Sequence, residues 1–150
     1  MQTSSLTLKV TARGCAFALA TLFAAMCGGA GAQTVTKAEV NVVPTSAPQP
    51  KGVCTTKGNF RICVDPEPVT TGGPTGGNVE ILWDLKGSGW SFVKNKGIDI
   101  KNRKNWKIKE VTATQYSATN KKEVNVLYKY EINVTNGTTT LPPWDPTIMN

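Results

Sequence analysis

The sequence predicts an all-β protein, an antiparallel β-sandwich of about seven strands. Two observations predict this fold class. Apolar residues alternate with polar ones in several short stretches, and turns rich in Gly, Asn and Pro separate these stretches. Beyond residue 32, no stretch has the periodicity of an amphipathic helix. A small β-barrel is the alternative architecture, because the same alternation also suits a closed sheet.

Residues 1–32 have the three parts of an export signal. Lys9 and Arg13 give a positive flank, residues 15–27 form an apolar uncharged run, and residues 30–32 (Ala-Gly-Ala) are the small residues that signal peptidase accepts. We therefore expect cleavage after Ala32 and a periplasmic or extracellular protein. The apolar run is too short to span a bilayer, which takes about 20 apolar residues, so no transmembrane span is expected.

The cysteines bear on both anchoring and metal binding. Cys27 ends the apolar run, where a lipoprotein signal has its acylated cysteine, but Met26 precedes it instead of a small residue, so lipidation is the weaker alternative. Cleavage leaves Cys54 and Cys63, and an even pair in an oxidising compartment predicts one disulfide. Because the chain has no His, zinc, haem and type-1 copper sites are disfavoured, and we expect neither a metal nor a cofactor.

Residues 33–150 are the size of one ordinary domain. The first part, residues 33–52, is predicted to precede the domain core. Residues 33–43 alternate only weakly, which is typical of an edge strand or a frayed terminus, and residues 44–51 form a Pro-rich connector. The β-sandwich domain itself is expected to span residues 53–150.

A two-residue turn at Gly58-Asn59 predicts a β-hairpin over residues 53–64. In this register Cys54 lies opposite Cys63 in a non-hydrogen-bonded pair, with Cα atoms about 4.5 Å apart, which a disulfide tolerates. The turn and the disulfide therefore support the same register. Closing so short a loop is expected to stabilise the fold by about 2 to 3 kcal/mol.

The remaining elements follow from alternation and turn residues. Residues 65–77 are rich in Pro and Gly and predict a loop. Strands are expected near residues 79–85, 90–92, 98–100, 106–109, 111–117 and 124–134, with turns at 87–89, 102–105 and 119–122. The stretch 124–134 has the clearest pattern, because every even-numbered position is apolar or aromatic. Residues 141–146 form a rigid segment, and residues 147–150 could add a last short strand.

The charge of the chain is concentrated in one basic stretch. The formal net charge is +7, and between residues 94 and 109 seven cations accompany a single carboxylate, Asp99. These cations are Lys94, Lys96, Lys101, Arg103, Lys104, Lys107 and Lys109. With Trp90 and Trp106 at its ends, such a stretch is typical of a surface that binds anionic polymers, with an affinity that falls as salt rises. The alternative is that these side chains only keep strand edges soluble.

No catalytic residue is predicted. The chain has no His and shows no nucleophile-elbow, phosphate-loop or calcium-loop motif after residue 32. Glu80 and Asp84 share a strand face but lie roughly 13 Å apart, which is wider than the carboxylate pairs of glycosidases. An enzyme would need three or more carboxylates to converge in one pocket. The candidates are Glu80, Asp84, Asp99, Glu110 and Glu131.

Residues 79–150 carry a pattern of paired apolar positions. It consists of Trp83-x-Leu85, Trp90-x-Phe92, Gly97-Ile98-x-Ile100, Tyr128-x-Tyr130-x-Ile132-x-Val134 and Asp145-Pro146-x-Ile148-x-Asn150. This pattern resembles small exported proteobacterial proteins. The resemblance implies an immunoglobulin-like or metal-free cupredoxin-like sandwich, and it implies no activity and no functional residue.

These observations predict a non-catalytic binding or structural module, secreted or periplasmic. We expect its loops or an exposed sheet edge to recognise an envelope protein or an anionic envelope polymer, whereas nucleic acid is not expected as the partner. Two other functions stay open: a carboxylate-based envelope enzyme and an inhibitor of an exported hydrolase. The inhibitor would need a rigid protruding loop at residues 65–77 or 141–146.

Overall fold

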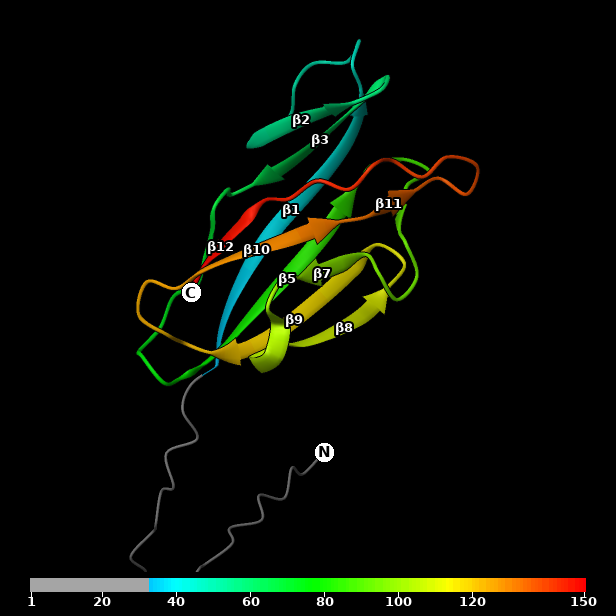
Figure 1. The fold of residues 1–150 in the computed structure, drawn as a ribbon. Helices are drawn as coiled ribbons and strands as arrows, with labels where there is room; N and C mark the ends of the chain where they lie inside the picture. The colour runs from blue at the N-terminus through cyan, green and yellow to red at the C-terminus, as the bar shows by residue number, and fades with distance from the viewer. Residues whose placement is uncertain (1–32) are drawn as a thin grey trace, which may run out of the picture.

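The computed structural model describes residues 33–150, which form two facing layers of β-strands (Figure 1). The predicted leader, residues 1–32, lies outside these residues. One layer contains β1 (Thr34–Pro44), β2 (Val53–Lys57), β3 (Phe60–Asp65), β5 (Asn78–Lys86), β8 (Lys107–Thr112) and β9 (Gln115–Lys121). The other contains β4 (Val69–Thr70), β7 (Ile98–Ile100), β10 (Leu127–Ile132) and β12 (Thr147–Met149). The short strands β6 (Ser91–Phe92) and β11 (Val134–Thr135) pair with each other.

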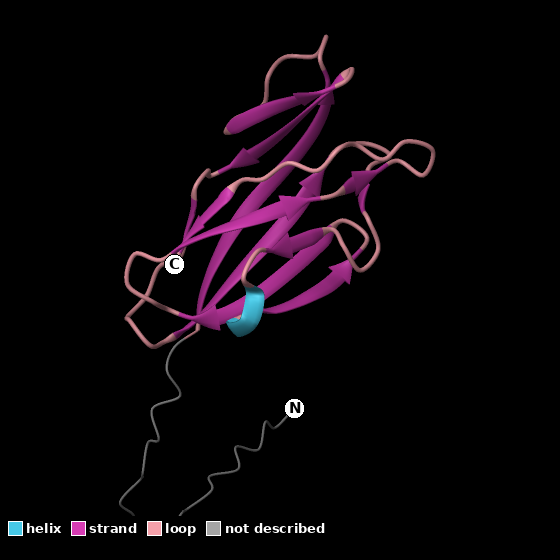
Figure 2. Cartoon of the chain, viewed as in Figure 1, coloured by secondary structure: helices cyan, strands magenta, loops and turns pink. Residues whose placement is uncertain are grey.

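The strand order is β2-β3-β1-β5-β9-β8 in the six-stranded sheet and β4-β12-β10-β7 in the four-stranded sheet. In Figure 1, β10 crosses β1 and β5, which places the core between the two layers. The single helical element of residues 33–150 is the one-turn 3-10 helix η1 (Arg103–Asn105), drawn in cyan in Figure 2. No helix of these residues is long and apolar enough to cross a membrane.

The core forms where the apolar positions of the alternating strands face each other. Trp83 of β5 and Tyr130 of β10 are both 0% exposed, and their ring centroids are 5.3 Å apart, so they join the two layers. Ile132 and Ile148 are also 0% exposed. Burying a side chain of this size contributes roughly 1.5 to 3 kcal/mol. The predicted all-β sandwich is confirmed.

The topology departs from the prediction in two respects. β1 pairs with β5, and β12 pairs with β4, in parallel, so the sheets are mixed rather than purely antiparallel. The strands also exceed the predicted seven, because several of them span only two or three residues. Alternation reports which residues face inward but not which strand lies alongside, and parallel partners are distant in sequence. Within residues 33–150 the sheets stay open, so the alternative of a small closed barrel is wrong.

β1 lies in the middle of the six-stranded sheet, between β3 and β5. The prediction of an edge strand or a frayed terminus at this place is therefore wrong, and the sandwich begins at Thr34 rather than at residue 53. Ala38 and Val40 are 0% exposed, while Lys37 and Glu39, which alternate with them, face solvent. The polar residues that weaken the alternation thus belong to the outer face of a central strand.

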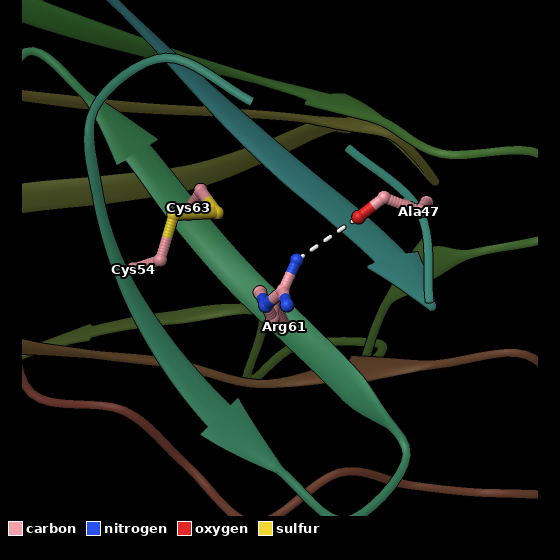
Figure 3. The surroundings of a disulfide bond; sticks show 4 residues. All are labelled: Ala47, Cys54, Arg61 and Cys63. Atoms are coloured by element: carbon pink, nitrogen blue, oxygen red, sulfur yellow. Dashed lines mark hydrogen bonds between the residues drawn. A yellow bond between two sulfur atoms is a disulfide. The ribbon is translucent and has the colours of Figure 1, made fainter. Parts of the chain in front are cut away.

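β2 and β3 form the predicted hairpin, with Lys57 opposite Phe60. Cys54 lies opposite Cys63 (Figure 3). The predicted disulfide is confirmed, with Cα atoms 4.0 Å apart. Gly58 has a φ of 62°, a left-handed conformation that glycine adopts without steric cost. The guanidinium of Arg61 donates a hydrogen bond of 3.0 Å to the carbonyl of Ala47, which holds the Pro-rich connector against β3.

Three segments differ from the predicted boundaries. The predicted loop at 65–77 contains β4, which pairs with β12. The predicted strand at 111–117 and turn at 119–122 are also wrong, because β8 ends at Thr112 and β9 continues to Lys121. The turn between them, residues 113–114 (Ala-Thr), contains neither Gly nor Pro and therefore gives no turn signal in the sequence.

The predicted strand at 124–134 is divided. Tyr130 and Ile132 are buried as predicted. However, Val124 is 67% exposed, and Asn125 has a φ of 51°, so the chain turns there and β10 begins at Leu127. β11 follows β10 as a separate short strand, because it pairs with β6 instead of β7.

Candidate functional site

A polar pocket of about 700 Å³ lies at the end of the sandwich where η1, the start of β5 and the end of β9 meet. Its lining combines amide and hydroxyl side chains, namely Gln33, Asn78, Asn105, Asn120 and Thr119, with three lysines and two further residues. The lysines are Lys104, Lys107 and Lys121, and the further residues are Trp106 and Glu123. We call this the polar pocket.

The strand register places the lysines of the polar pocket beside neutral polar residues. Lys107 lies opposite Thr119 across β8 and β9, and Lys121 lies opposite Asn78 across β9 and β5. Lys104 belongs to η1, which follows Asn102 in its left-handed conformation at a φ of 56°. All three lysines are exposed, and within residues 33–150 none of them forms an ion pair.

Glu123, the carboxylate in the lining, does not neutralise the charge of the three lysines. Glu123 accepts a 2.5 Å hydrogen bond from the Tyr128 hydroxyl, which fixes the carboxylate at the protein wall. Burial, helped by this hydrogen bond and by the charge of Glu123, raises the pKa of Tyr128. The tyrosine therefore stays a neutral donor at physiological pH, and three cations face one carboxylate in the polar pocket.

The wall of the polar pocket contains two buried N–H donors that make no hydrogen bond. Trp106 is 6% exposed and Asn120 is 8% exposed, and their Nε1 and Nδ2 atoms are buried and unpaired. The Asn120 carbonyl oxygen accepts from the Lys121 backbone N–H at 2.7 Å, which leaves the amide nitrogen free. Both donors lie near the Tyr128 hydroxyl and lower its pKa, less than burial raises it, but neither reaches this hydroxyl with the geometry of a hydrogen bond. An unpaired buried donor costs about 1 to 3 kcal/mol, so a polar group that reached them would stabilise the wall.

The seven cations of the predicted basic stretch have different surroundings. Lys104 and Lys107 line the polar pocket, whereas Lys101 pairs with Glu131 and Arg103 pairs with Asp99 at 3.3 Å. The other members of the stretch are exposed, and Lys96 lines a separate pocket. These members are Lys94, Lys96 and Lys109.

Lys121 was not among the predicted site residues, because it stood in a predicted turn outside the basic stretch. Asn120 stood in the same predicted turn and Glu123 directly followed it, so both were missed as well. The only signal in the sequence is the polar run at 119–123, which becomes informative once β9 is known to pair with β5 and β8.

The carboxylates proposed for catalysis are dispersed. Asp99 and Glu131 lie opposite each other across β7 and β10 and line a second pocket of about 440 Å³, but each pairs with a cation. Glu80 accepts from the Gln33 amide at 2.6 Å, and Asp84 pairs with Lys86. The five carboxylates therefore do not meet the condition that three converge in one pocket.

Glu110 is tied into the fold rather than free for catalysis. Its Oε2 accepts from the Asn95 backbone N–H at 2.8 Å and from the Tyr116 hydroxyl at 2.9 Å. The Asn95 N–H is the main reason why the pKa of Glu110 is lowered. Across the described part of the chain, no three Cys, Asp or Glu side chains are grouped as a metal ion requires.

The two loops proposed for an inhibitor are packed against the sheets. Glu67 accepts hydrogen bonds from the backbone N–H and the hydroxyl of Thr147, at 2.8 and 2.7 Å, and residues 69–70 form β4. The second loop runs beside β10, where the Ile132 N–H donates to the Trp144 carbonyl at 2.9 Å. Residues 72–76 remain exposed, but neither loop protrudes as a rigid unit over its whole length.

The chain was also compared with known proteins. No protein-family model matches it, and a search of the curated proteins gives no match either.

Proposed function

We propose that this protein is a non-catalytic binding module that is exported to the periplasm or the extracellular space and recognises an anionic envelope polymer. The observation that carries the proposal is the set of three unpaired lysines around the polar pocket, Lys104, Lys107 and Lys121. Cations that converge on a concave surface attract a polyanion and gain affinity as bound counterions are released.

The proposed location rests on two features. The disulfide between Cys54 and Cys63 suits an oxidising compartment, and the leader pattern at residues 1–32 supports export. The immunoglobulin-like topology stays a prediction. An envelope protein with an acidic surface is the second kind of partner that the same lysines suit.

Salt-dependent binding of a model polyanion tests the proposal. Dextran sulfate is titrated into the protein in about 50 mM and about 200 mM salt. If each pocket lysine displaces one counterion, the affinity falls by about 40-fold over this range. A salt-independent affinity, or no binding at low salt, contradicts the proposal.

A matched pair of triple variants tests whether the polyanion binds at the polar pocket. The variant Lys104→Gln, Lys107→Gln, Lys121→Gln removes the cations of the polar pocket. The control carries Gln at Lys37, Lys51 and Lys129, which are exposed, form no ion pair within residues 33–150 and lie outside the lining. We expect the pocket variant to lose most of its affinity and the control to keep it. Equal losses would mean that net charge alone drives binding and would overturn the proposal.

A further inference from the structure

The aromatic residues of the basic stretch offer no free face to a nucleobase. Trp106 is 6% exposed, and Tyr128 covers it edge to face at a centroid distance of 5.5 Å. Trp90, at the other end of the stretch, is 7% exposed and packs against Phe60 at 5.0 Å. Proteins that bind single-stranded nucleic acid stack bases on accessible aromatic rings, and this site has none.

The polar pocket offers neutral hydrogen-bonding side chains instead. Asn78, Asn105 and Thr119 line it, and within residues 33–150 their side chains make no hydrogen bond. An amide both donates and accepts, as a sugar hydroxyl does, so these groups suit the hydroxyl-rich surface of a saccharide. The volume of about 700 Å³ also lies in the usual range of pockets that bind small ligands.

The unpaired donors in the wall point to an acceptor with more than one oxygen. Trp106 Nε1 and Asn120 Nδ2 belong to side chains that are more than nine-tenths buried, and both residues line the polar pocket. A carboxylate has two oxygens and accepts from two separate N–H groups. The Tyr128 hydroxyl lies near both donors, so a carboxylate that accepts from them has to displace this hydroxyl.

We infer that the polar pocket binds a short segment of a carboxylate-bearing glycan, such as a chain of uronic acids. Lys104, Lys107 and Lys121 pair with the sugar carboxylates. Asn78, Asn105 and Thr119 bind the hydroxyls, and the Trp106 and Asn120 N–H groups donate to one carboxylate. This inference rests on the proposed function and narrows its partner to one class of polymer.

Calorimetry with three probes of similar length tests the inference. The probes are a tetramer of galacturonic acid, the same tetramer with its carboxylates methyl-esterified, and an oligothymidylate of equal charge. We expect the acidic tetramer to bind at least about tenfold more tightly than either of the others, because only it offers carboxylates and hydroxyls together. Equal affinity for the ester or for the oligothymidylate overturns the inference.

Two tryptophan variants separate the pocket wall from the rest of the stretch. Trp106→Phe keeps a ring but removes the Nε1 donor, so we expect about tenfold weaker binding of the acidic tetramer. Trp90→Phe is the control, since Trp90 is equally buried but lies outside the lining, and its affinity should not change. Thermal unfolding checks that both variants are folded at the assay temperature. An unchanged affinity in Trp106→Phe contradicts the assignment of the donors.

Failure of this inference is distinguishable from failure of the proposed function. If dextran sulfate binds through the three lysines but the galacturonate tetramer binds no better than oligothymidylate, the glycan assignment is wrong and anion binding stands. If neither dextran sulfate nor the tetramer binds at low salt, both are wrong.

Discussion

Trp83 and Tyr130 meet in the centre of the sandwich with ring centroids 5.3 Å apart, and Trp106 and Tyr128 repeat this contact at 5.5 Å near the polar pocket. Burial raises the pKa of Tyr130, and its hydroxyl has the Trp83 indole for a neighbour, as Tyr128 has Trp106. The difference lies in the hydrogen bonding. Tyr128 donates to Glu123, whereas the Tyr130 hydroxyl is buried without a partner. The pair of Trp83 and Tyr130 is thus enclosed in the core, whereas the pair of Trp106 and Tyr128 borders the polar pocket.

Tyr130→Phe and Tyr128→Phe are therefore expected to differ in stability. Removing the unpaired hydroxyl of Tyr130 should leave the free energy of unfolding unchanged or raise it by up to about 1 kcal/mol. Removing the donor of Glu123 in Tyr128→Phe should lower it by about 1 kcal/mol. Urea denaturation measures both. A loss above about 2 kcal/mol in Tyr130→Phe would contradict this and indicate a buried water on the hydroxyl.

Gly97 permits a close approach that no side chain could replace. A Cβ at this position would lie 2.5 Å from the Phe92 Cβ and 2.6 Å from the Tyr116 Cε2. We expect Gly97→Ala to lower the free energy of unfolding by about 1 to 3 kcal/mol through overpacking. Gly72→Ala is the control, because its nearest neighbour is a methyl group of Thr34 at 3.3 Å, and it should change stability far less in the same thermal unfolding assay.

The disulfide joins cysteines nine residues apart. Replacing both Cys54 and Cys63 with Ala should lower the free energy of unfolding by about 2 to 3 kcal/mol, since the closed loop is short. Urea denaturation with and without reductant supplies the control. The native protein should lose the same amount on reduction, while the double variant should not respond. A response of the double variant to reductant would show that the loss has another origin.

We expect acid to weaken the contribution of Glu110 to the stability of the folded protein. Hydrogen bonds from Asn95 and Tyr116 hold the pKa of this carboxyl below its ordinary value of 4.5 in the folded protein. Its contribution to stability is therefore fully present above that ordinary value and is lost as the pH falls through the lower pKa of the folded state. We expect the stability of Glu110→Gln to fall less between about pH 5 and about pH 3 than that of the native protein.

Denaturation curves at several pH values check this expectation. Glu80→Gln is a useful control, because Glu80 lies on a strand and accepts a single side-chain hydrogen bond, from Gln33. The same slope against pH in Glu110→Gln and in the native protein would be evidence against the assigned role.

Local signals in the sequence predicted the hairpin down to its register. The turn at Gly58-Asn59 and the cysteine pair Cys54 and Cys63 constrain the same few residues, so no distant partner is needed. The position of β1 could not be predicted in this way. Its neighbour β5 begins more than thirty residues after β1 ends, and alternation does not identify a partner at that distance.

The candidate site was predicted only in part, because some of its residues are neighbours in sequence and others come together only through strand pairing. Lys104, Trp106 and Lys107 are neighbours in sequence, and the basic stretch included or bordered them. Lys121 and Asn120 reach the polar pocket only through the pairing of β9 with β5 and β8. Lys101 and Arg103 form ion pairs and are therefore not free cations. These ion pairs also depend on contacts that the sequence does not specify.

The central place of β1 has a consequence for proteolysis. Because β1 is hydrogen-bonded along both sides, excision of residues 34–44 would separate the β2–β3 hairpin from β5 and its neighbours. A peptidase that trims the chain from its amino end thus finds no dispensable strand to remove before the whole domain loses its integrity.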